Sequence, residues 1–589
     1  MTAVWRRNRT KCLHLGQRAQ DVVAARQTGH VFLVLSRHHD GAVITPLGDD
    51  GEPDGEPRAL SRIELAAEVA RLEAQRPLPT GRLTWVWDDT TRWYPPLLAA
   101  GVRVERCVDL RLSHAILRNS ELTAASALAM AGHNDWDGPP REECSDDGLF
   151  ALDAPREPAD PAAEFRLQRE AIAASVDPAR IGLLLAAESA GALVAAEMQF
   201  AGLPWREELH DELLTELLGP RPKPGERPAK LAVVLQRVRD ALDAPDLNPD
   251  SPAELIKALQ RAGLMVTSTR SWDIKKLKHP VVEPLLEHKK LARLLSANGW
   301  HWLDANVQNG RFRPDYVVGG VVTGRWASTG GGGALQLPKQ VRGAVVADPG
   351  WKLVVADASQ LEPRILAAIS GDRGMAEAGQ AKDMYAAIVA SGAVATRDHA
   401  KVAMLGAMYG STTGESGRLL PALTRAYPRA IALVEKAARD GERGEIVTTR
   451  LGRSSPRPGA SWQQAQSEAY GETATDADAS RARGQARSWG RFTRNFVVQG
   501  TAAEWALCWM ATLRGSLREL GGDTWLTDAP HLVFFLHDEI VVHSPATMTD
   551  AVVAAIERAA VEAGRLLFGV TPVEFPLSMV VIDNYAQAK

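Results

Sequence analysis

Cysteine is scarce in this chain, and its placement excludes two structural classes. Four cysteines occur in 589 residues, at Cys12, Cys107, Cys144 and Cys508. None forms a Cys-x-x-Cys pair, which argues against a zinc site or a disulfide framework. The same pattern fits a reducing compartment, so we expect a cytoplasmic protein.

Long apolar runs and a leader-like start are also missing. No uninterrupted apolar stretch approaches the ~20 residues of a membrane span. The first residues, Met1–Arg9, carry charge with no apolar region behind them, so no secretory signal and no membrane association are expected. The apolar fraction of 45% is ordinary for a globular protein, and 589 residues suffice for several domains.

A strong net charge is absent, although local charge is pronounced. The formal net charge is −4, so overall charge indicates no nucleic-acid partner. Residues 257–293 nevertheless carry nine Lys or Arg against three acids. Residues 481–494 carry five Arg and no acid, with Arg483, Arg487, Arg491 and Arg494 spaced for one face of a helix. Such a face is either simply solvated or a stripe that follows phosphates.

The order of expected elements divides the chain into a mixed part, a helical part and a second mixed part. Residues 1–118 contain expected strands at 31–35, 83–87 and 102–108, and a helix at 61–76 with a capping box. Residues 131–162 are expected to be a linker or exposed loop. Helices then follow at 164–175, 181–201, 207–218, 230–242, 252–262 and 281–297. Strands return at 315–323, 344–356 and 531–543, with a helix-rich insertion at 375–510.

Two of the late apolar runs end in a carboxylate. Asp357 follows the run that starts at Trp351, and Asp538 follows the run that starts at His531. A lone strand-end Asp is more often a helix cap or a turn residue. A second one changes the balance, because two metal ions about 3.5–4 Å apart need carboxylates from separate elements.

Between the two acids the sequence predicts a helix with a cationic end. Arg397 and Lys401 are four residues apart, and Tyr409 lies eight beyond Lys401, close to the same face. A cationic pair alone is usually a surface feature. Beside two carboxylates it supplies the cations that nucleotidyl transfer from a triphosphate requires. The pattern predicts a nucleic-acid polymerase, and beside such a site the phosphate-following stripe is favoured for residues 481–494.

Five ordered motifs between about 320 and 540 resemble those of family A DNA polymerases, the DNA polymerase I family. Asp357–Arg364 resembles Asp-Tyr-Ser-Gln-Ile-Glu-Leu-Arg, and Arg397–Gly410 resembles Arg-x3-Lys-x3-Phe-Gly-x2-Tyr-Gly. Leu536–Glu539 resembles Val-His-Asp-Glu. Thr323–Ser328 resembles Thr-Gly-Arg-x-x-Ser, and Arg491–Glu504 resembles Arg-x3-Asn-x3-Gln-Gly-Thr-Ala-Ala-Asp. Weaker similarity runs from residue 163 to the C-terminus.

The resemblance implies a catalytic set made of Asp357, Asp538 and Lys401. The two aspartates would bind two Mg²⁺ ions, with Mn²⁺ as a possible substitute, assisted by the carbonyl group of Ala358. Arg397 and Lys401 would bind the incoming triphosphate, and Lys401 would also protonate pyrophosphate.

The resemblance further implies how the nucleotide and the DNA are held. Glu362 would stand against the sugar 2′ position and exclude ribonucleotides, and Tyr409 would stack at the nascent base pair. His537 would contact the primer end or the nucleotide's phosphates. The residues expected to bind primer-template DNA are Arg325, Arg491, Asn495 and Gln499.

Three departures from the family's pattern change the character of the side chain. Ala358 replaces Tyr near the nascent pair, Leu405 replaces the Phe that lies under the nucleotide's sugar and base, and Pro363 replaces Leu. None of the three is a metal-binding side chain. The departures therefore bear on fidelity and sugar discrimination rather than on the chemistry.

The implied fold is α+β, a right-hand polymerase preceded by a ribonuclease-H-like, 3′–5′ exonuclease-like α/β domain. Expected boundaries are 1–155 for the exonuclease-like domain, 156–300 for a helical thumb, 301–374 and 491–589 for the palm, and 375–490 for the fingers. No room is left for a 5′-nuclease domain. We expect a monomer that binds primer-template DNA and dNTPs, associated with the nucleoid if the source is bacterial.

The exonuclease-like domain is expected to be degenerate. A two-metal nuclease needs an Asp-x-Glu on its first strand, and the strand at 31–36 has no acid. Asp-x-Glu occurs at 50–52 and 54–56, but in a turn rich in Pro and Gly. Asp88, Asp89 and Asp109 could be remnants of later motifs.

Three alternatives stay open beside a DNA polymerase without proofreading. A single-subunit RNA polymerase would share the core, although a ribonucleotide user would want a small residue at Glu362. A catalytically silent DNA-binding scaffold is disfavoured by the intact acids and cations. A bifunctional enzyme with an active 3′–5′ exonuclease is the third, and the choice between repair and replication stays open.

Overall fold

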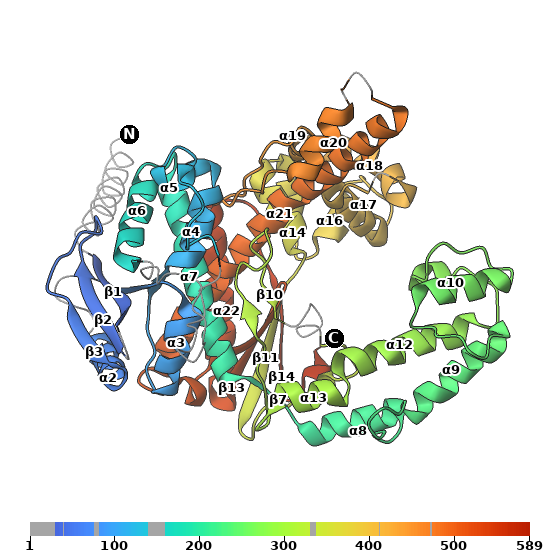
Figure 1. The fold of residues 1–589 in the computed structure, drawn as a ribbon, viewed down its shortest axis with the longest axis horizontal. Coiled ribbons are helices and arrows are strands. Elements are labelled where there is room, and N and C mark those ends of the chain that lie inside the picture. Colours follow the sequence, from blue (N-terminus) through green and yellow to red (C-terminus); the bar gives the residue numbers. More distant parts are fainter. Residues whose placement is uncertain are drawn as a thin grey trace, which may run out of the picture.

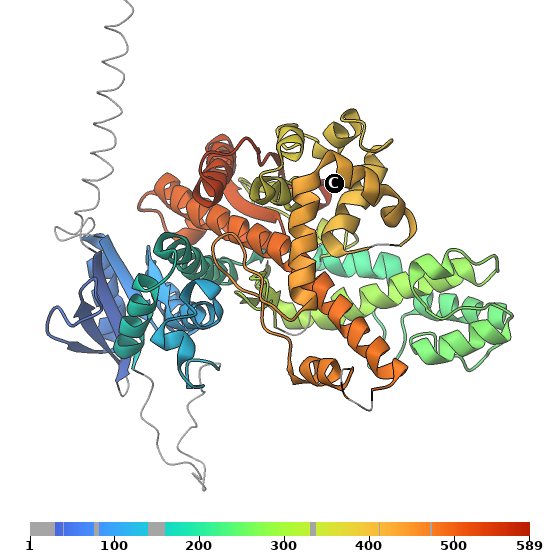
Figure 2. The same ribbon diagram turned by 90° about the horizontal axis from the view of Figure 1, so that it is seen from above.

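The computed structural model describes residues 30–38, 41–75, 82–138, 160–329, 337–411, 413–469, 471 and 474–588. A mixed sheet at the N-terminal side is followed by a long helical arm, a central antiparallel sheet and a group of helices above that sheet (Figure 1). Seen from above, the N-terminal sheet and the arm lie at opposite ends of the molecule (Figure 2).

The N-terminal sheet has five strands in the order β3-β2-β1-β4-β5. The first three strands pair antiparallel, and β1 with β4 and β4 with β5 pair parallel. Strand bounds are β1 His30–His38, β2 Gly41–Leu47, β3 Arg58–Ser61, β4 Arg82–Trp87 and β5 Cys107–Asp109. Its helices are α2 Arg62–Ala74, α3 Thr90–Ala99, α4 Leu110–Asn119 and α5 Ala127–Met130. The expected capping box at Ser61 and Glu64 is present at the start of α2.

One helix joins this sheet to the rest of the protein. α7 (Pro178–Ala201) follows α6 (Pro161–Ala173) and packs against α3, α4 and β5 on one side and against α21 and β12 on the other. Among the described residues α7 alone is long and apolar enough to cross a bilayer, which the sequence did not lead us to expect, and 72% of its apolar window is buried. It has the burial of a core helix.

The helical arm extends from the central sheet and carries a small core at its tip. That core is formed by apolar side chains such as Val238, Leu255 and Leu285. The arm's helices are α8 Glu207–Leu218, α9 Ala229–Leu242, α10 Pro252–Arg261, α11 Ser271–Ile274, α12 Val282–Asn298 and α13 Trp300–Asn306. Every helix expected here is present, with ends that differ by a few residues.

The central sheet has four antiparallel strands in the order β12-β13-β11-β14. Their bounds are β11 Trp351–Ala358, β12 His531–Leu536, β13 Glu539–Pro545 and β14 Leu577–Ile582. The long helices α21 (Asp476–Gly521) and α22 (Thr549–Phe568) pack together and against this sheet (Figure 1). Short strands complete the base: β6 Leu203–Pro204, β7 Val307–Gln308, β8 Arg311–Phe312, β9 Tyr316–Val317 and β10 Ala327–Ser328.

The helices above the sheet come from the insertion between β11 and β12. They are α14 Leu361–Ser370, α15 Arg373–Ala378, α16 Met384–Ala390, α17 Arg397–Tyr409, α18 Gly414–Ala426, α19 Pro428–Glu442 and α20 Ala460–Ala469. α21 starts among them and ends beside the central sheet, so one continuous helix joins the two regions (Figure 2).

Three expected strands are shorter than the apolar runs suggested. The run at 344–356 forms a strand only from Trp351, because residues 342–344 make a 3₁₀ turn and Trp351 N closes a turn onto Asp348 O at 2.9 Å. The run at 102–108 contributes only the start of β5, and the run at 315–323 only β9. Part of the expected linker at 131–162 lies outside the described residues.

Candidate active site

Asp357 and Asp538 meet at one end of the central sheet. Asp357 is near the end of β11 and is paired in register with Glu539 of β13. Asp538 stands in the tight turn between β12 and β13, and the Ala358 N–H donates to the Asp538 main-chain oxygen at 2.9 Å. His537, beside it, has a φ of 60°, a left-handed conformation that the turn requires. The hairpin therefore brings two motifs far apart in sequence into contact.

The surroundings of Asp538 disfavour its negative charge. Burial, together with the nearby charge of Asp357, raises the pKa of Asp538 to about 7. The two carboxylates repel each other and Asp538 is largely shielded from water. A divalent cation bound between them would offset both the repulsion and the loss of hydration. No group of three or more His, Cys, Asp or Glu side chains that could hold a metal occurs within the described ranges.

α17 carries a row of four functional candidates, one per turn. Arg397, Lys401, Leu405 and Tyr409 are each four residues apart, and the helix ends at Gly410 in the left-handed region with a φ of 73°. A side chain at Gly410 would meet the Arg491 side chain, since a Cβ there would lie 2.9 Å from it. Glycine thus lets α17 end close against α21.

The cations of α17 differ in their surroundings. Arg397 donates through Nε to Asp383 at 2.7 Å, and Lys401 is exposed. Leu405, the replacement for the family's Phe, is half-buried and packs against the main core. The charged end of α17 is therefore open to solvent while its middle is packed.

Glu362 connects three separate elements. It lies in the first turn of α14 and accepts from Tyr409 Oη at 2.6 Å and from Arg325 Nη2 at 2.5 Å. Burial and the Glu362 carboxylate raise the pKa of Tyr409, so the phenol stays protonated and donates. The structure thus brings together three residues that the sequence placed in three different motifs. Pro363 fits the first turn of α14, where a missing N–H costs little.

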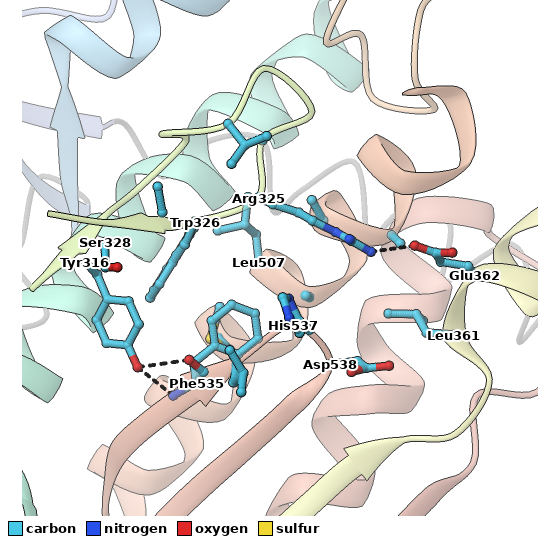
Figure 3. A pocket seen from close by; sticks show the side chains of 18 residues that line it. Tyr316, Arg325, Trp326, Ser328, Leu361, Glu362, Leu507, Phe535, His537 and Asp538 are labelled. Atoms are coloured by element: carbon cyan, nitrogen blue, oxygen red, sulfur yellow. Dashed lines mark hydrogen bonds and ion pairs between the residues drawn. The ribbon is translucent and has the colours of Figure 1, made fainter. Parts of the chain in front are cut away.

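A cavity of about 350 Å³ opens between this network and the β12–β13 hairpin (Figure 3). Arg325, Glu362, His537 and Asp538 line one side, and an apolar group lines the other. The apolar lining includes Tyr316, Trp326, Leu507, Met510 and Phe535. In Figure 3 the Arg325–Glu362 pair and Asp538 border the same space.

The DNA-binding candidates on α21 follow one another at four-residue intervals. Arg491 is exposed, and Asn495 and Gln499 are half-buried. Asn495 Oδ1 is buried and has no hydrogen-bond partner within the described structure. Arg494 was expected in the basic stripe, but it is 4% exposed. It donates to Ala407 O at 2.7 Å and pairs with Glu435, so the stripe is reduced to the exposed Arg483, Arg487 and Arg491.

A second, larger cavity of about 1340 Å³ lies between the arm and the base of the central sheet. Its lining holds many cations and one acid, Asp250. The cations are Arg227, Arg270, Lys289, Lys290, Arg293, Lys339 and Arg342. Four of them belong to the basic segment at 257–293, whose other Lys and Arg do not line this cavity.

The acids of the N-terminal part serve structural roles. Asp88 accepts from Arg92 at 2.8 Å and from the Trp93 indole at 2.6 Å. Asp89 caps α3, and Asp109 caps α4 while also accepting from Thr90 N at 2.8 Å. Burial raises the pKa of Asp109 to about 7. The charge of Asp89 adds to that rise, so these two acids lie near each other. In the loop, Glu52 pairs with Arg166 at 2.8 Å.

Arg364, the last residue of the first motif, has a role that the sequence did not reveal. Its side chain is fully buried and donates to main-chain oxygens of Ser359, Gly379, Ala381, Lys382 and Glu574 at 2.7–3.0 Å. Burial lowers its pKa to about 10. The only sequence feature that could have indicated this role is an Arg among the apolar residues of α14. The Arg364 side chain links two segments. It ties the start of α14 to the segment before α16.

Comparison with known proteins agrees with this geometry. The POL domain of Pol1 from M. smegmatis, solved in complex with DNA primer-template and dNTP, covers 96% of this chain and 98% of its own at a TM-score of 0.62 and 16% identity. The chain thus has the fold of a polymerase domain. The family model of DNA polymerase family A matches residues 228–580, and this chain belongs to that family.

The curated relatives match this chain over only part of their length. The thermostable DNA polymerase I of Thermus thermophilus is 26% identical over 354 residues, which are 55% of this chain and 38% of that protein. The DNA polymerase I of Chloroflexus aurantiacus is 28% identical over 330 residues, 51% of this chain and 32% of that protein. The chain therefore spans less than two fifths of the length of these relatives.

Proposed function

We propose that this chain is a DNA-directed DNA polymerase that adds dNTPs to a primer 3′ end on a DNA template. One observation carries the proposal: Asp357 and Asp538 adjoin at the end of the sheet, beneath a helix with Arg397 and Lys401 at its open end. Membership of family A and the fold of a polymerase domain support it.

The metal requirement rests on the chemistry of the two acids. Asp357 and Asp538 would hold two Mg²⁺ ions, or Mn²⁺ in their place, together with the Ala358 carbonyl. Bound metal would supply charge neutralisation at the phosphates and a lowered pKa for the primer hydroxyl. Around it, Arg397 and Lys401 would bind the triphosphate oxygens, and Lys401 would hold the proton that pyrophosphate takes up.

The remaining residues would select and orient the substrates. Glu362, held by Arg325 and Tyr409, would occupy the space that a ribose 2′-hydroxyl needs. Tyr409 would stack at the nascent pair, and His537 would contact the primer end. Arg325, Arg491, Asn495 and Gln499 would contact the duplex, and the cations of the larger cavity would face its phosphates.

Within this proposal the domains keep the boundaries expected from the sequence. Residues 156–300 would form the thumb, 375–490 the fingers, and 301–374 with 491–589 the palm. Two features cut across these boundaries. α6 and α7 pack against the N-terminal sheet and not in the arm, and α7 also packs against α21 and β12. α21 runs without a break across the boundary at 490. Residues 1–155 form an exonuclease-like domain without proofreading activity, because Asp88, Asp89 and Asp109 are committed to structural bonds. A monomer in a reducing cytoplasm fits the free, buried Cys107 and Cys508.

A primer-extension assay tests the proposal. The wild-type chain should extend a labelled primer only with Mg²⁺ or Mn²⁺ and with dNTPs rather than ribonucleotides. Asp538→Asn should lower the rate by at least about a thousandfold while primer-template binding persists. Asp523→Asn, at an exposed position beyond the end of α21, is the matched control and should extend normally. Near-normal extension by the Asp538 variant would refute the assignment.

A further inference from the structure

The guanidinium of Arg397 is held by residues that belong to none of the sequence motifs. Nε donates to Asp383 Oδ2 at 2.7 Å, and the guanidinium carbon lies 5.6 Å from the centre of the Tyr385 ring. A bond through Nε leaves the N–H groups of both terminal nitrogens for a ligand. The side chain is 53% exposed, so those groups are accessible to solvent.

Asp383 is itself fixed by its other oxygen. Oδ1 accepts from the main-chain N–H groups of Tyr385 and Ala386, at 3.1 and 3.2 Å, where Asp383 caps α16. It also accepts from Gln360 Nε2 at 2.9 Å. Gln360 closes the link by accepting from Met384 N at 2.8 Å. One oxygen of Asp383 therefore binds Gln360 and the start of α16, which we call the scaffold, and the other oxygen binds Arg397.

The scaffold behind Asp383 is anchored to the catalytic strand. Gln360 lies two residues beyond the end of β11 and has a φ of 56°, a left-handed conformation just before α14. The buried Arg364 binds the main-chain oxygens of Ala381 and Lys382, the two residues before Asp383, at 2.8 and 3.0 Å. Asp383 is thus tied to the strand that carries Asp357, although it belongs to another segment of the chain.

We propose that Asp383 is a positioning residue for the nucleotide: it holds Arg397 by Nε so that both terminal nitrogens face the triphosphate. The inference rests on the proposed function, since it concerns the same site. A long, exposed Arg side chain loses freedom when it binds a ligand, and fixing it beforehand lowers that cost. The opposite role, in which Asp383 competes with the phosphates for Arg397, is disfavoured because Asp383 binds at Nε rather than at the terminal nitrogens.

Steady-state kinetics with a primer-template and varied dNTP tests this proposal. Asp383→Ala should raise the dNTP KM about tenfold and change kcat by less than about threefold. Asp383→Asn keeps one oxygen for the cap of α16 but turns its amide nitrogen, a donor, toward Arg397 Nε, so its KM should rise nearly as much as in Asp383→Ala. Glu377→Ala removes an exposed acid of α15 that pairs with Arg373, and should leave KM unchanged.

A double variant separates positioning from a merely structural effect. If Asp383 acts through Arg397, then Asp383→Ala/Arg397→Ala should have the KM of Arg397→Ala alone, because the residue it positions is gone. Independent, multiplying effects of the two substitutions would overturn the proposal. A lower KM in Asp383→Ala would show competition instead, and an unchanged KM would show that Asp383 does not act on the nucleotide.

The same experiment distinguishes failure of the inference from failure of the proposed function. A wild-type chain that extends no primer with any metal or nucleotide would refute the polymerase assignment, and the inference with it. A wild-type chain that extends primers, with Asp383 variants that match it, would refute the inference alone.

Discussion

The main-chain N–H of Ala358 donates a hydrogen bond to the main-chain oxygen of Asp538 at 2.9 Å. This bond joins the end of β11 to the turn of the β12–β13 hairpin, and it sets the two catalytic candidates beside each other. It also makes the backbone at Ala358 part of the site's framework, whatever side chain stands there. The loss of the family's Tyr at this position therefore leaves the placement of the two acids intact.

The stability of the metal-free protein should depend on pH through Asp538. Its pKa is raised to about 7 in the folded chain and is near 3.8 when unfolded, so between these values the folded state holds a proton that the unfolded state has lost. Stability contributed by this group therefore falls as pH rises toward about 7. In EDTA, the melting temperature of Asp538→Asn relative to that of the wild type should increase from pH 5 to pH 7 and stay constant above pH 7. A difference that is constant with pH would contradict this.

Metal addition should act on the same residue. At pH 8, Mg²⁺ or Mn²⁺ should raise the melting temperature of the wild-type chain, because a ligand that binds only the folded state stabilises it. Asp538→Asn should show little of this rise, and Asp523→Asn all of it. Equal rises in all three chains would place metal binding elsewhere.

Lys401→Ala should impair use of the triphosphate. Lys401 is exposed at the open end of α17, one turn from Arg397, so its loss should raise the dNTP KM and lower kcat, with a combined effect of about ten- to a hundredfold. Pre-steady-state kinetics at varied dNTP measures both. Arg425→Ala, an exposed cation near the end of α18, is the control. Unchanged nucleotide dependence in Lys401→Ala would remove α17 from the nucleotide site.

Glu362→Ala should admit ribonucleotides. The carboxylate is fixed by Arg325 and Tyr409, so it cannot easily move away from a 2′-hydroxyl. The ratio of ribonucleotide to deoxyribonucleotide incorporation should rise by at least about tenfold, and Tyr409→Phe, which removes one of the two donors, should raise it less. Glu377→Ala, at an exposed acid of α15, should leave the ratio alone. A ratio unaffected by Glu362→Ala would refute the gate.

The purified protein should not shorten a 3′ end. A mismatched, labelled primer incubated with Mg²⁺ or Mn²⁺ and no nucleotides should stay intact, because Asp88, Asp89 and Asp109 are engaged in an ion pair and in helix caps, and no group of three or more potential metal-binding side chains occurs among the described residues. Shortening that is lost in Asp88→Ala/Asp89→Ala but survives Asp538→Asn would show an active N-terminal nuclease. Asp109→Ala should instead lower the melting temperature, since Asp109 accepts from Thr90 N and Leu112 N.

Two arginines of α21 should behave differently despite lying on the predicted stripe. Arg487 is exposed, so Arg487→Ala should weaken primer-template binding and lower its salt dependence without changing the melting temperature. Arg494 is buried against Ala407 O and the partly exposed Glu435, so Arg494→Ala should destabilise the fold by about 1–3 kcal/mol, because the buried Ala407 O loses its donor. Similar effects of the two substitutions on DNA binding and on stability would contradict this division.

The sequence by itself determined the parts of this protein that depend on local pattern. Hydrophobic periodicity and caps predicted the arm helices and the start of α2 at Ser61, because helices are built from contacts between near neighbours in the chain. The spacing of Arg397, Lys401 and Tyr409 predicted their row on α17 for the same reason. The five ordered motifs predicted the family, and the match to the model of DNA polymerase family A confirmed it.

Only the tertiary structure decided which side chains meet across distant segments. Arg494 has the spacing of a surface arginine, and its burial follows from Glu435 of α19 packing beside it. Asp383 has no motif around it, and its place beside Arg397 follows from the turn at Gln360 and the clamp of Arg364. Spacing along a chain fixes the face of a helix, but what that face touches depends on how separate elements pack, and no local pattern contains that information.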